Sequence, residues 1–135
     1  MGLILDTCIL IRAERGHALD FSRWANYGNA FISVITVSEL LVGVHRADSD
    51  ARRIRRSAFV EAILAQLPVL DFTMETARIH ASLFAALSQQ GQRIGAHDLI
   101  IAATAISHDC AVLTTNTAEF ARVPGLDVVE PMANR

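Results

Sequence analysis

The sequence predicts an α/β fold, specifically an α/β/α sandwich with a mostly parallel central sheet. Short apolar runs, typical of strands buried on both faces, alternate with longer segments of helical spacing. Strands that alternate with helices need crossover connections, which give parallel neighbours covered by helices. At 135 residues with 52% hydrophobic content, the chain suits one compact core, so we expect a single domain over residues 1–135.

Five apolar runs are predicted to be strands. The first ends at Asp6, where the continuous apolar pattern stops. The fourth is followed by Thr114, Thr115 and Asn116, polar residues typical of the turn after a strand. The predicted strands are residues 2–5, 31–33, 69–72, 111–113 and 128–129.

The segments between these runs are predicted to be helices. In residues 73–89 the apolar side chains recur at helical spacing, and Gly91 is a stop signal. A short helix is expected to begin near Thr7, directly after Asp6. The longer predicted helices are residues 19–27, 37–45, 49–66, 73–89 and 97–108.

Charge gives the chain no general attraction to nucleic acid. The formal net charge is −2, so phosphate binding would need a local group of arginines or a metal ion. All 12 cationic side chains are arginines, and the densest group is Arg52, Arg53, Arg55 and Arg56. Such a run is usually a solvated helix face, and its functional alternative is contact with phosphate or with an acidic partner.

Neither a membrane protein nor a disulfide scaffold is predicted. No apolar stretch reaches the roughly 18 residues of a membrane span, and the start of the chain lacks the pattern of a secretion signal. We therefore expect a soluble cytoplasmic protein. Cys8 and Cys110 lack the spacing of a zinc site and are interpreted as reduced packing residues.

Four polar residues stand where an apolar run ends or a helix begins: Asp6, Glu39, Asp98 and Asn116. The carboxyl ends of parallel strands meet at one edge of a sheet, so we expect these side chains to converge there. Carboxylates gathered in one place repel each other. A fold that collects them therefore needs a bound cation or raised pKa values.

Each of these residues also has an ordinary structural alternative. Asp98 is also explained as an acid at a helix N-terminus, Asp6 as a helix cap and Asn116 as a turn residue. Glu39 lies among apolar neighbours, so it is either on the solvated side of its helix or a partly buried ligand. The histidines have no ligand spacing such as HExxH, and His97 is of interest only because it adjoins Asp98.

Four segments carry a family resemblance. They are LILDTCIL around Asp6, VSELLVG around Glu39, IGAHDLIIAATA around Asp98 and LTTNTAEFARVPGL around Asn116. In this order they resemble the motifs of PIN-domain proteins and, more narrowly, of the VapC-type toxins of bacterial toxin–antitoxin pairs. The resemblance extends from Leu3 to about Val129.

That resemblance implies a PIN-like sandwich and an endoribonuclease that depends on Mg²⁺ or Mn²⁺. It further implies a homodimer, and a cognate antitoxin protein that binds the toxin in a hetero-oligomer. Carried over by position, Asp6, Glu39 and Asp98 would be metal ligands, and Asn116 would take the fourth place, often an aspartate. Asn116 removes one negative charge there, so the number of ions, one or two, stays open.

The carboxylates of the candidate site suit a hard cation such as Mg²⁺. Mg²⁺ prefers carboxylate oxygens and water, whereas a soft metal would need cysteine or histidine. We expect Asp6 and Asp98 to be direct ligands, Glu39 a ligand or the group that positions water, and Asn116 a water-mediated contact. Thr115 and the arginine run from Arg52 to Arg56 are candidate contacts for RNA or antitoxin.

Two alternatives belong to other functional classes. The first is a PIN-like module that binds RNA or protein without cleaving it, because activity depends on accurate placement of the acids. The second is a phospho-acceptor signalling domain, which also has an aspartate at a strand end. That class needs a lysine near the carboxylate, and this sequence contains no lysine.

Overall fold

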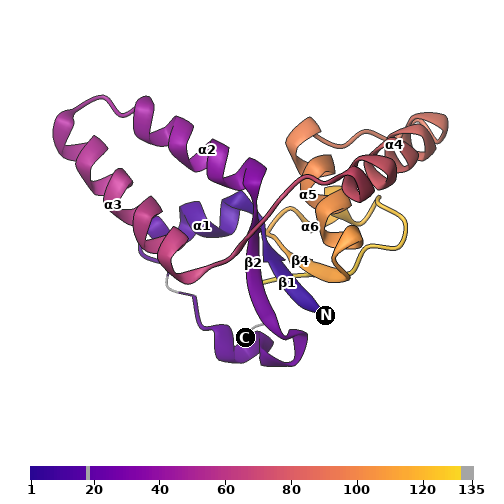
Figure 1. The fold of residues 1–135 in the computed structure, drawn as a ribbon, viewed down its shortest axis with the longest axis horizontal. Coiled ribbons are helices and arrows are strands. Elements are labelled where there is room, and N and C mark those ends of the chain that lie inside the picture. Colours follow the sequence, from indigo (N-terminus) through magenta and orange to yellow (C-terminus); the bar gives the residue numbers. More distant parts are fainter. Residues whose placement is uncertain (18, 132–135) are drawn as a thin grey trace.

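The computed structural model describes residues 1–17 and 19–131. Within these residues the chain forms a five-stranded sheet in the order β3-β2-β1-β4-β5, and every strand pair is parallel (Figure 1). The central strand β1 pairs with β2 on one side and β4 on the other. The strands are β1 Gly2–Leu5, β2 Asn29–Ser33, β3 Val69–Leu70, β4 Cys110–Leu113 and β5 Val128–Val129.

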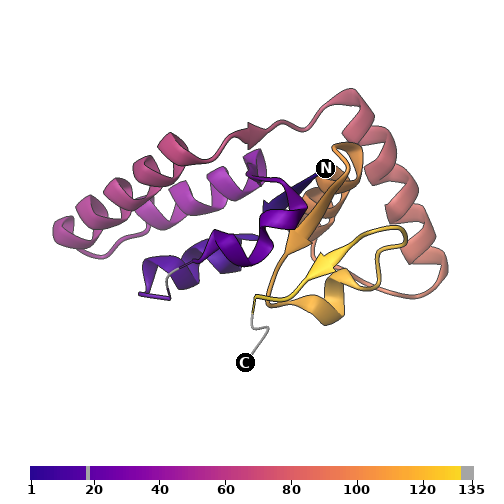
Figure 2. The same ribbon diagram turned by 90° about the horizontal axis from the view of Figure 1, so that it is seen from below.

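Helices cover both faces of this sheet. Alternate side chains of a strand point to opposite faces, and here both faces are buried. Ile4 packs in one apolar cluster with α4, α5 and α6, while Leu3 and Leu5 pack in a second cluster with α1, α2 and α3 (Figures 1 and 2). The helices are α1 Thr7–Glu14, the 3-10 helix η1 Phe21–Tyr27, α2 Val34–His45, α3 Asp50–Gln66, α4 Met74–Gln89, α5 Ala96–Ser107 and α6 Thr117–Phe120.

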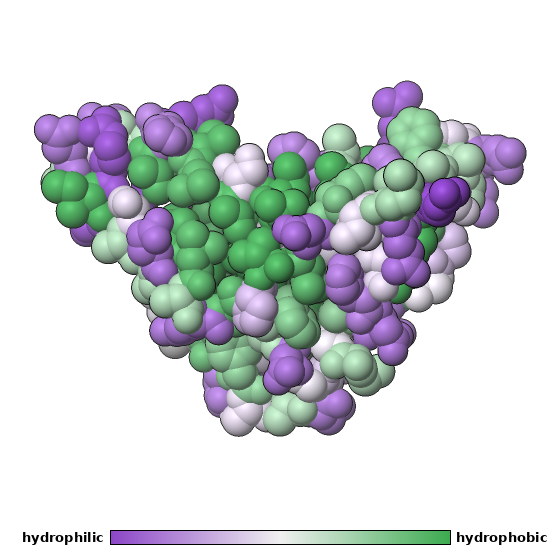
Figure 3. Space-filling view, viewed as in Figure 1, coloured by the Kyte–Doolittle hydropathy of each residue, from purple (hydrophilic) through white to green (hydrophobic). Residues whose placement is uncertain are grey.

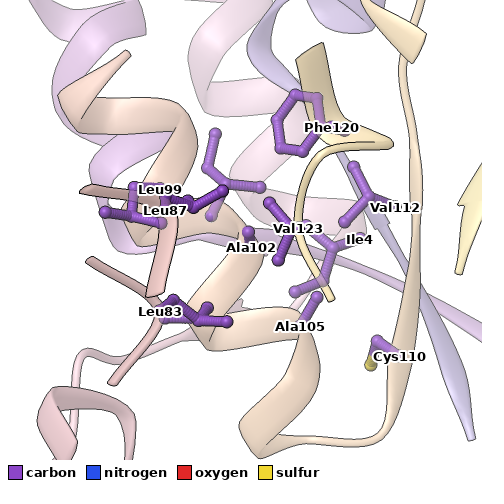
Figure 4. Packing of buried hydrophobic residues seen from close by; sticks show 12 residues of the cluster. Ile4, Leu83, Leu87, Leu99, Ala102, Ala105, Cys110, Val112, Phe120 and Val123 are labelled. Atoms are coloured by element: carbon purple, nitrogen blue, oxygen red, sulfur yellow. The ribbon is translucent and has the colours of Figure 1, made fainter. Parts of the chain in front are cut away.

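The first of these clusters is shown in Figure 4. Leu83 and Leu87 of α4 meet Leu99 of α5, and Phe120 of α6 closes the cluster near β4. Phe120 is fully buried, so its ring fixes α6 against the sheet. The predicted α/β/α sandwich with a parallel sheet is therefore confirmed.

Most predicted elements agree with the structure within a few residues. The largest difference that matters for the site is the start of α2, which begins at Val34 rather than at residue 37. Ser33 caps this helix, since its hydroxyl accepts a hydrogen bond from the Ile35 amide at 3.2 Å. The short helix expected after Asp6 is α1, and Gly91 follows α4 with a positive φ of 68°, as its role in ending that helix requires.

Two arms rise from the sheet and give the molecule a V-shaped outline (Figure 1). The hairpin of α2 and α3 forms one arm, and α4 with α5 forms the other. Apolar surface spreads across the middle of the face shown in Figure 3. Exposed large apolar side chains include Val34 and Val42 on α2 and Phe72 after β3. Among the described residues, no helix is both long and apolar enough to span a membrane.

Candidate active site

Asp6 lies where β1 meets α1, beside the end of β4. The register pairs Leu5 with Leu113, and the Asp6 amide donates to the Leu113 carbonyl at 2.9 Å. One carboxylate oxygen of Asp6, Oδ1, accepts from the Thr7 amide at 2.8 Å, and Oδ2 accepts from the Thr114 hydroxyl at 2.7 Å. Asp6 is only 5% exposed, so it is a helix cap and also a buried carboxylate at the sheet edge.

Glu39 reaches the same edge from α2. It is the sixth residue of that helix, which places it in the second turn rather than in the first as predicted. Oε1 accepts from the Thr7 hydroxyl at 2.5 Å, and Oε2 lies 3.1 Å from Nδ1 of His97. Glu39 is partly buried, so the structure favours the inward-facing alternative over the solvated one. Its carboxylate is held by α1 on one side and α5 on the other.

Asp98 and Glu119 form an acid pair next to these residues. Asp98 is the third residue of α5, and burial is the main cause that raises its pKa to about 8. A hydrogen bond with Glu119 and the charges of Asp6, Glu119 and Glu39 raise the pKa of Asp98 further. The pKa of Glu119 is lowered, chiefly by that hydrogen bond. Without a cation, the pair therefore carries one proton at neutral pH, and it resides on Asp98.

Sequence reasoning missed Glu119. Its carboxylate accepts a hydrogen bond from the Gly95 amide at 2.8 Å and another from the side-chain amide of Asn116. The two residues are three apart on α6 and its N-cap, so they share one side of the helix. An acid at this spacing from Asn116 was the available signal. The structure places an acid beside Asn116, which restores the negative charge that Asn116 lacks.

Asn116 contacts the site through its neighbours. Its backbone amide donates to the Thr114 hydroxyl at 2.9 Å, and that hydroxyl in turn donates to Asp6. Asn116 is therefore linked to Asp6 only through the Thr114 hydroxyl, whereas its side-chain amide hydrogen-bonds directly to Glu119.

Thr115 and Cys8 form a further contact at the edge of the site. The Thr115 hydroxyl donates to Sγ of Cys8 at 3.2 Å, and this thiol lies 3.2 Å from Oδ2 of Asp6. Interpreting Cys8 as a packing residue alone was therefore incomplete. Cys110 is buried in the core, as predicted, and both thiols are free.

The arginine run lies on α3, on the arm of the α2–α3 hairpin (Figure 1). Arg52 pairs with Asp48 at 3.1 Å, and Arg53 pairs with Asp50 at 2.6 Å. Arg56 donates to the Gly43 carbonyl at 2.8 Å, while Arg55 is exposed. These contacts tie the hairpin together, and the proposed role of the run in RNA or antitoxin binding stays a prediction.

The donor set at this edge suits a hard cation. An open cavity of about 350 Å³ is lined by Glu39, His97, Asp98 and the Gly95–Ala96 turn. Within the described part of the chain, no three acid, imidazole or thiol groups already converge as a ready set of ligands. Carboxylate oxygens nevertheless dominate, and their mutual repulsion adds to the effect of burial in raising the pKa of Asp98. The residues therefore fit Mg²⁺ by chemistry, with side-chain rotation needed to enclose it.

Comparison with known proteins agrees with this site. The PIN domain family model matches residues 3–126. The chain is 42% identical to ribonuclease VapC1 of Rickettsia felis over 129 residues, which cover 96% of each chain. It is 34% identical to the tRNA(fMet)-specific endonuclease VapC of Shigella flexneri over 101 residues, covering 75% of this chain and 74% of that one.

A solved structure has the same fold. The DNA-bound VapBC of Salmonella typhimurium superposes with a TM-score of 0.86 at 29% identity, covering 98% of this chain and 99% of that chain. The fold and the acid cluster define a PIN-domain nuclease. The chain belongs to the PIN-domain family and, within it, to the VapC ribonucleases. The alternative of a phospho-acceptor signalling domain is therefore wrong.

Proposed function

We propose that this protein is a Mg²⁺-dependent endoribonuclease that acts as the toxin of a toxin–antitoxin pair, with Mn²⁺ as an alternative ion. The observation that carries the proposal is the gathering of Asp6, Glu39, Asp98 and Glu119 from four separate elements at one sheet edge. Ribonuclease VapC1 of Rickettsia felis, at 42% identity, supports the same activity.

The acids of the chain have distinct parts in this proposal. Asp6 and Asp98 would hold the ion, since both lie at the carboxyl edge of the sheet. Because the pKa of Asp98 is raised to about 8, binding of the ion would release the proton of this carboxyl. When bound, Mg²⁺ supplies charge neutralisation at the scissile phosphate and a water of lowered pKa. Glu39 would hold the ion or position the attacking water, because Thr7 and His97 fix both of its carboxylate oxygens. Glu119 adds a negative charge and a hydrogen bond to Asp98, and Asn116 holds Glu119 in place by donating a hydrogen bond to it.

The proposed substrate is RNA in a single-stranded loop. Splayed bases are accessible to an open site, whereas paired bases are not. Hydrolysis would leave 5′-phosphate and 3′-hydroxyl ends. Loops of transfer RNA and ribosomal RNA are both candidate targets, and the Shigella flexneri relative is a tRNA(fMet)-specific endonuclease.

The proposed partners are a cognate antitoxin and a second copy of the toxin. Solved relatives are VapBC complexes, including one from Rickettsia felis bound to a promoter DNA fragment. Exposed apolar side chains such as Val34, Val42 and Phe72 supply the surface that such assemblies need.

Cleavage of labelled RNA by antitoxin-free protein tests the proposal. We expect cleavage with Mg²⁺ or Mn²⁺ and none in excess chelator, while Asp6→Asn and Asp98→Asn remove it. Asp71→Asn changes an exposed acid outside the site and serves as the matched control. Cleavage that persists in chelator, or in both site variants, would contradict the proposal.

A non-catalytic binding module is the second candidate. It is favoured by one observation: within the described residues the acids do not yet form a ready set of metal ligands. RNA binding without cleavage, at any concentration of Mg²⁺ or Mn²⁺, would select this alternative.

A further inference from the structure

The loop between α4 and α5 borders the acid cluster and is fixed to α6 at two points. The Gly95 amide donates to Oε2 of Glu119 at 2.8 Å. The guanidinium of Arg122 donates to the backbone carbonyl of Arg93. Gly95 itself lies close to the acids, since a Cβ there would be 3.3 Å from Oδ2 of Asp98. The loop is thus held by two hydrogen bonds, with the acid site on one side of it.

A second cavity lies along the same loop. Its volume is about 590 Å³, within the range of small-molecule sites. Leu87 of α4 and Leu99 of α5, which lie side by side in Figure 4, are each 3% exposed and line the cavity as its apolar floor. Phe84 also lines the cavity and is 60% exposed, so one apolar wall is open to solvent. The two cavities are lined by neighbouring stretches of the chain. Arg93, Ile94 and Leu99 line this one, and Gly95, Ala96, His97 and Asp98 line the cavity of the acid site.

Polar groups surround this apolar floor. Ser88 and Gln92 line the cavity and offer a hydroxyl and an amide, which both donate and accept hydrogen bonds. Arg93 also lines it. Arg122 lies two residues after the end of α6, and its charge adds to the hydrogen bonds that lower the pKa of Glu119, so it acts on the acid site as well. Arg93 and Arg122 are both exposed residues, and they lie next to each other because the Arg122 guanidinium donates to the Arg93 carbonyl.

We infer that this cavity binds an unpaired base of the RNA, next to the scissile phosphate, while Arg93 and Arg122 bind the adjoining backbone phosphates. The inference rests on the proposed function. An apolar floor with an exposed aromatic ring beside it suits a base, because bases stack on aromatic side chains. Ser88 and Gln92 supply hydrogen bonds to the base edge. Arginines beside the cavity suit a polyanion, which a purely apolar partner would not require.

Binding of a short single-stranded RNA tests this inference separately from cleavage. The probe is a labelled 12-nucleotide RNA of mixed sequence, titrated with the full chain in excess chelator and again with Ca²⁺. Phe84→Ala should weaken binding about 5-fold to 100-fold, the loss expected for one stacked base. Phe84→Trp keeps an aromatic surface and should retain most of the affinity. Arg93→Ala should reduce the slope of log affinity against log salt by about 0.7.

Two controls come from the same helix. Arg78→Ala removes an exposed arginine from α4, and Met74→Ala removes a side chain that is 71% exposed at its start. Both should bind RNA like the unsubstituted protein. Sedimentation of every variant reports whether the cavity instead holds a second copy of the chain.

The inference is overturned if Phe84→Ala and Arg93→Ala bind RNA normally, or if they change only the sedimentation. It is also overturned if the unsubstituted protein binds no RNA in either condition. These outcomes are independent of the proposed activity, because Mg²⁺-dependent cleavage by the unsubstituted protein is measured on its own.

Discussion

Replacing Asp98 with asparagine should stabilise the cation-free protein at pH 8. The folded structure raises the pKa of Asp98 from 3.8 to about 8. Ionisation of this carboxyl therefore disfavours the folded state. The penalty is absent below pH 4, grows as the pH rises through the ordinary value, and is complete only above about pH 8. The asparagine amide can still donate to Glu119, as the protonated acid does, but it never ionises.

The size of this effect follows from the same shift. A change of about four pKa units corresponds to an upper limit of about 6 kcal/mol. Asp98 is partly exposed and is hydrogen-bonded to Glu119, so solvent screening and the lowered pKa of Glu119 reduce the effect. We expect about 1–2 kcal/mol in favour of Asp98→Asn at pH 8, which corresponds to about 3–8 °C in Tm.

Thermal unfolding in excess chelator between pH 5 and pH 8 measures the difference. The unsubstituted protein should lose stability relative to Asp98→Asn across this range, and saturating Mg²⁺ should reverse the order because only aspartate is a good ligand. Asp71→Asn controls for the loss of an exposed charge. Equal Tm values for Asp98→Asn and the unsubstituted protein at pH 8 in chelator would refute the reasoning.

Three further predictions follow from the site, the core and the surface. Glu119→Gln should weaken Mg²⁺ affinity about 10-fold to 100-fold, seen by calorimetry, whereas an unchanged affinity would remove Glu119 from the site. Phe120→Ala should lower the free energy of unfolding by about 3–5 kcal/mol in urea, because this ring is fully buried and fixes α6; a loss under 1 kcal/mol would show that the core repacks freely. Light scattering should give the mass of a homodimer, and a monomer at all concentrations would contradict the expected assembly.

Sequence patterns gave the layers and strand positions because burial on both faces of a parallel sheet leaves continuous apolar runs. The start of α2 was harder to predict, since Val34, Ile35 and Thr36 are β-branched and read as an extension of the preceding strand. Ser33 sets the start of α2 by capping the helix, through a local hydrogen bond that periodicity does not reveal. Because α2 begins three residues earlier than predicted, Glu39 lies nearly one turn further from the start of the helix than expected. At this position its carboxylate reaches both Thr7 and His97.

Glu119 was missed for a different reason. The helix that carries it, α6, has only four residues, which is about one turn and too short for a periodic signal. Its position is set by Phe120, whose burial orients the turn so that the preceding side chain faces Asp98. Pairing of acids from α5 and α6 is a tertiary contact. Only the folded chain shows which of the carboxylates shares a proton with another.

The hydrogen bond between Asp6 and Thr114 joins residues 108 positions apart. Asp6 leaves the ribosome early in synthesis, whereas β4 and α6 emerge among the last segments. A nascent chain therefore lacks the second half of its own acid cluster until translation is almost finished. A chain cut short before β4 would keep Asp6, Glu39 and Asp98 but lack Thr114 and Glu119, the hydrogen-bond partners of Asp6 and Asp98.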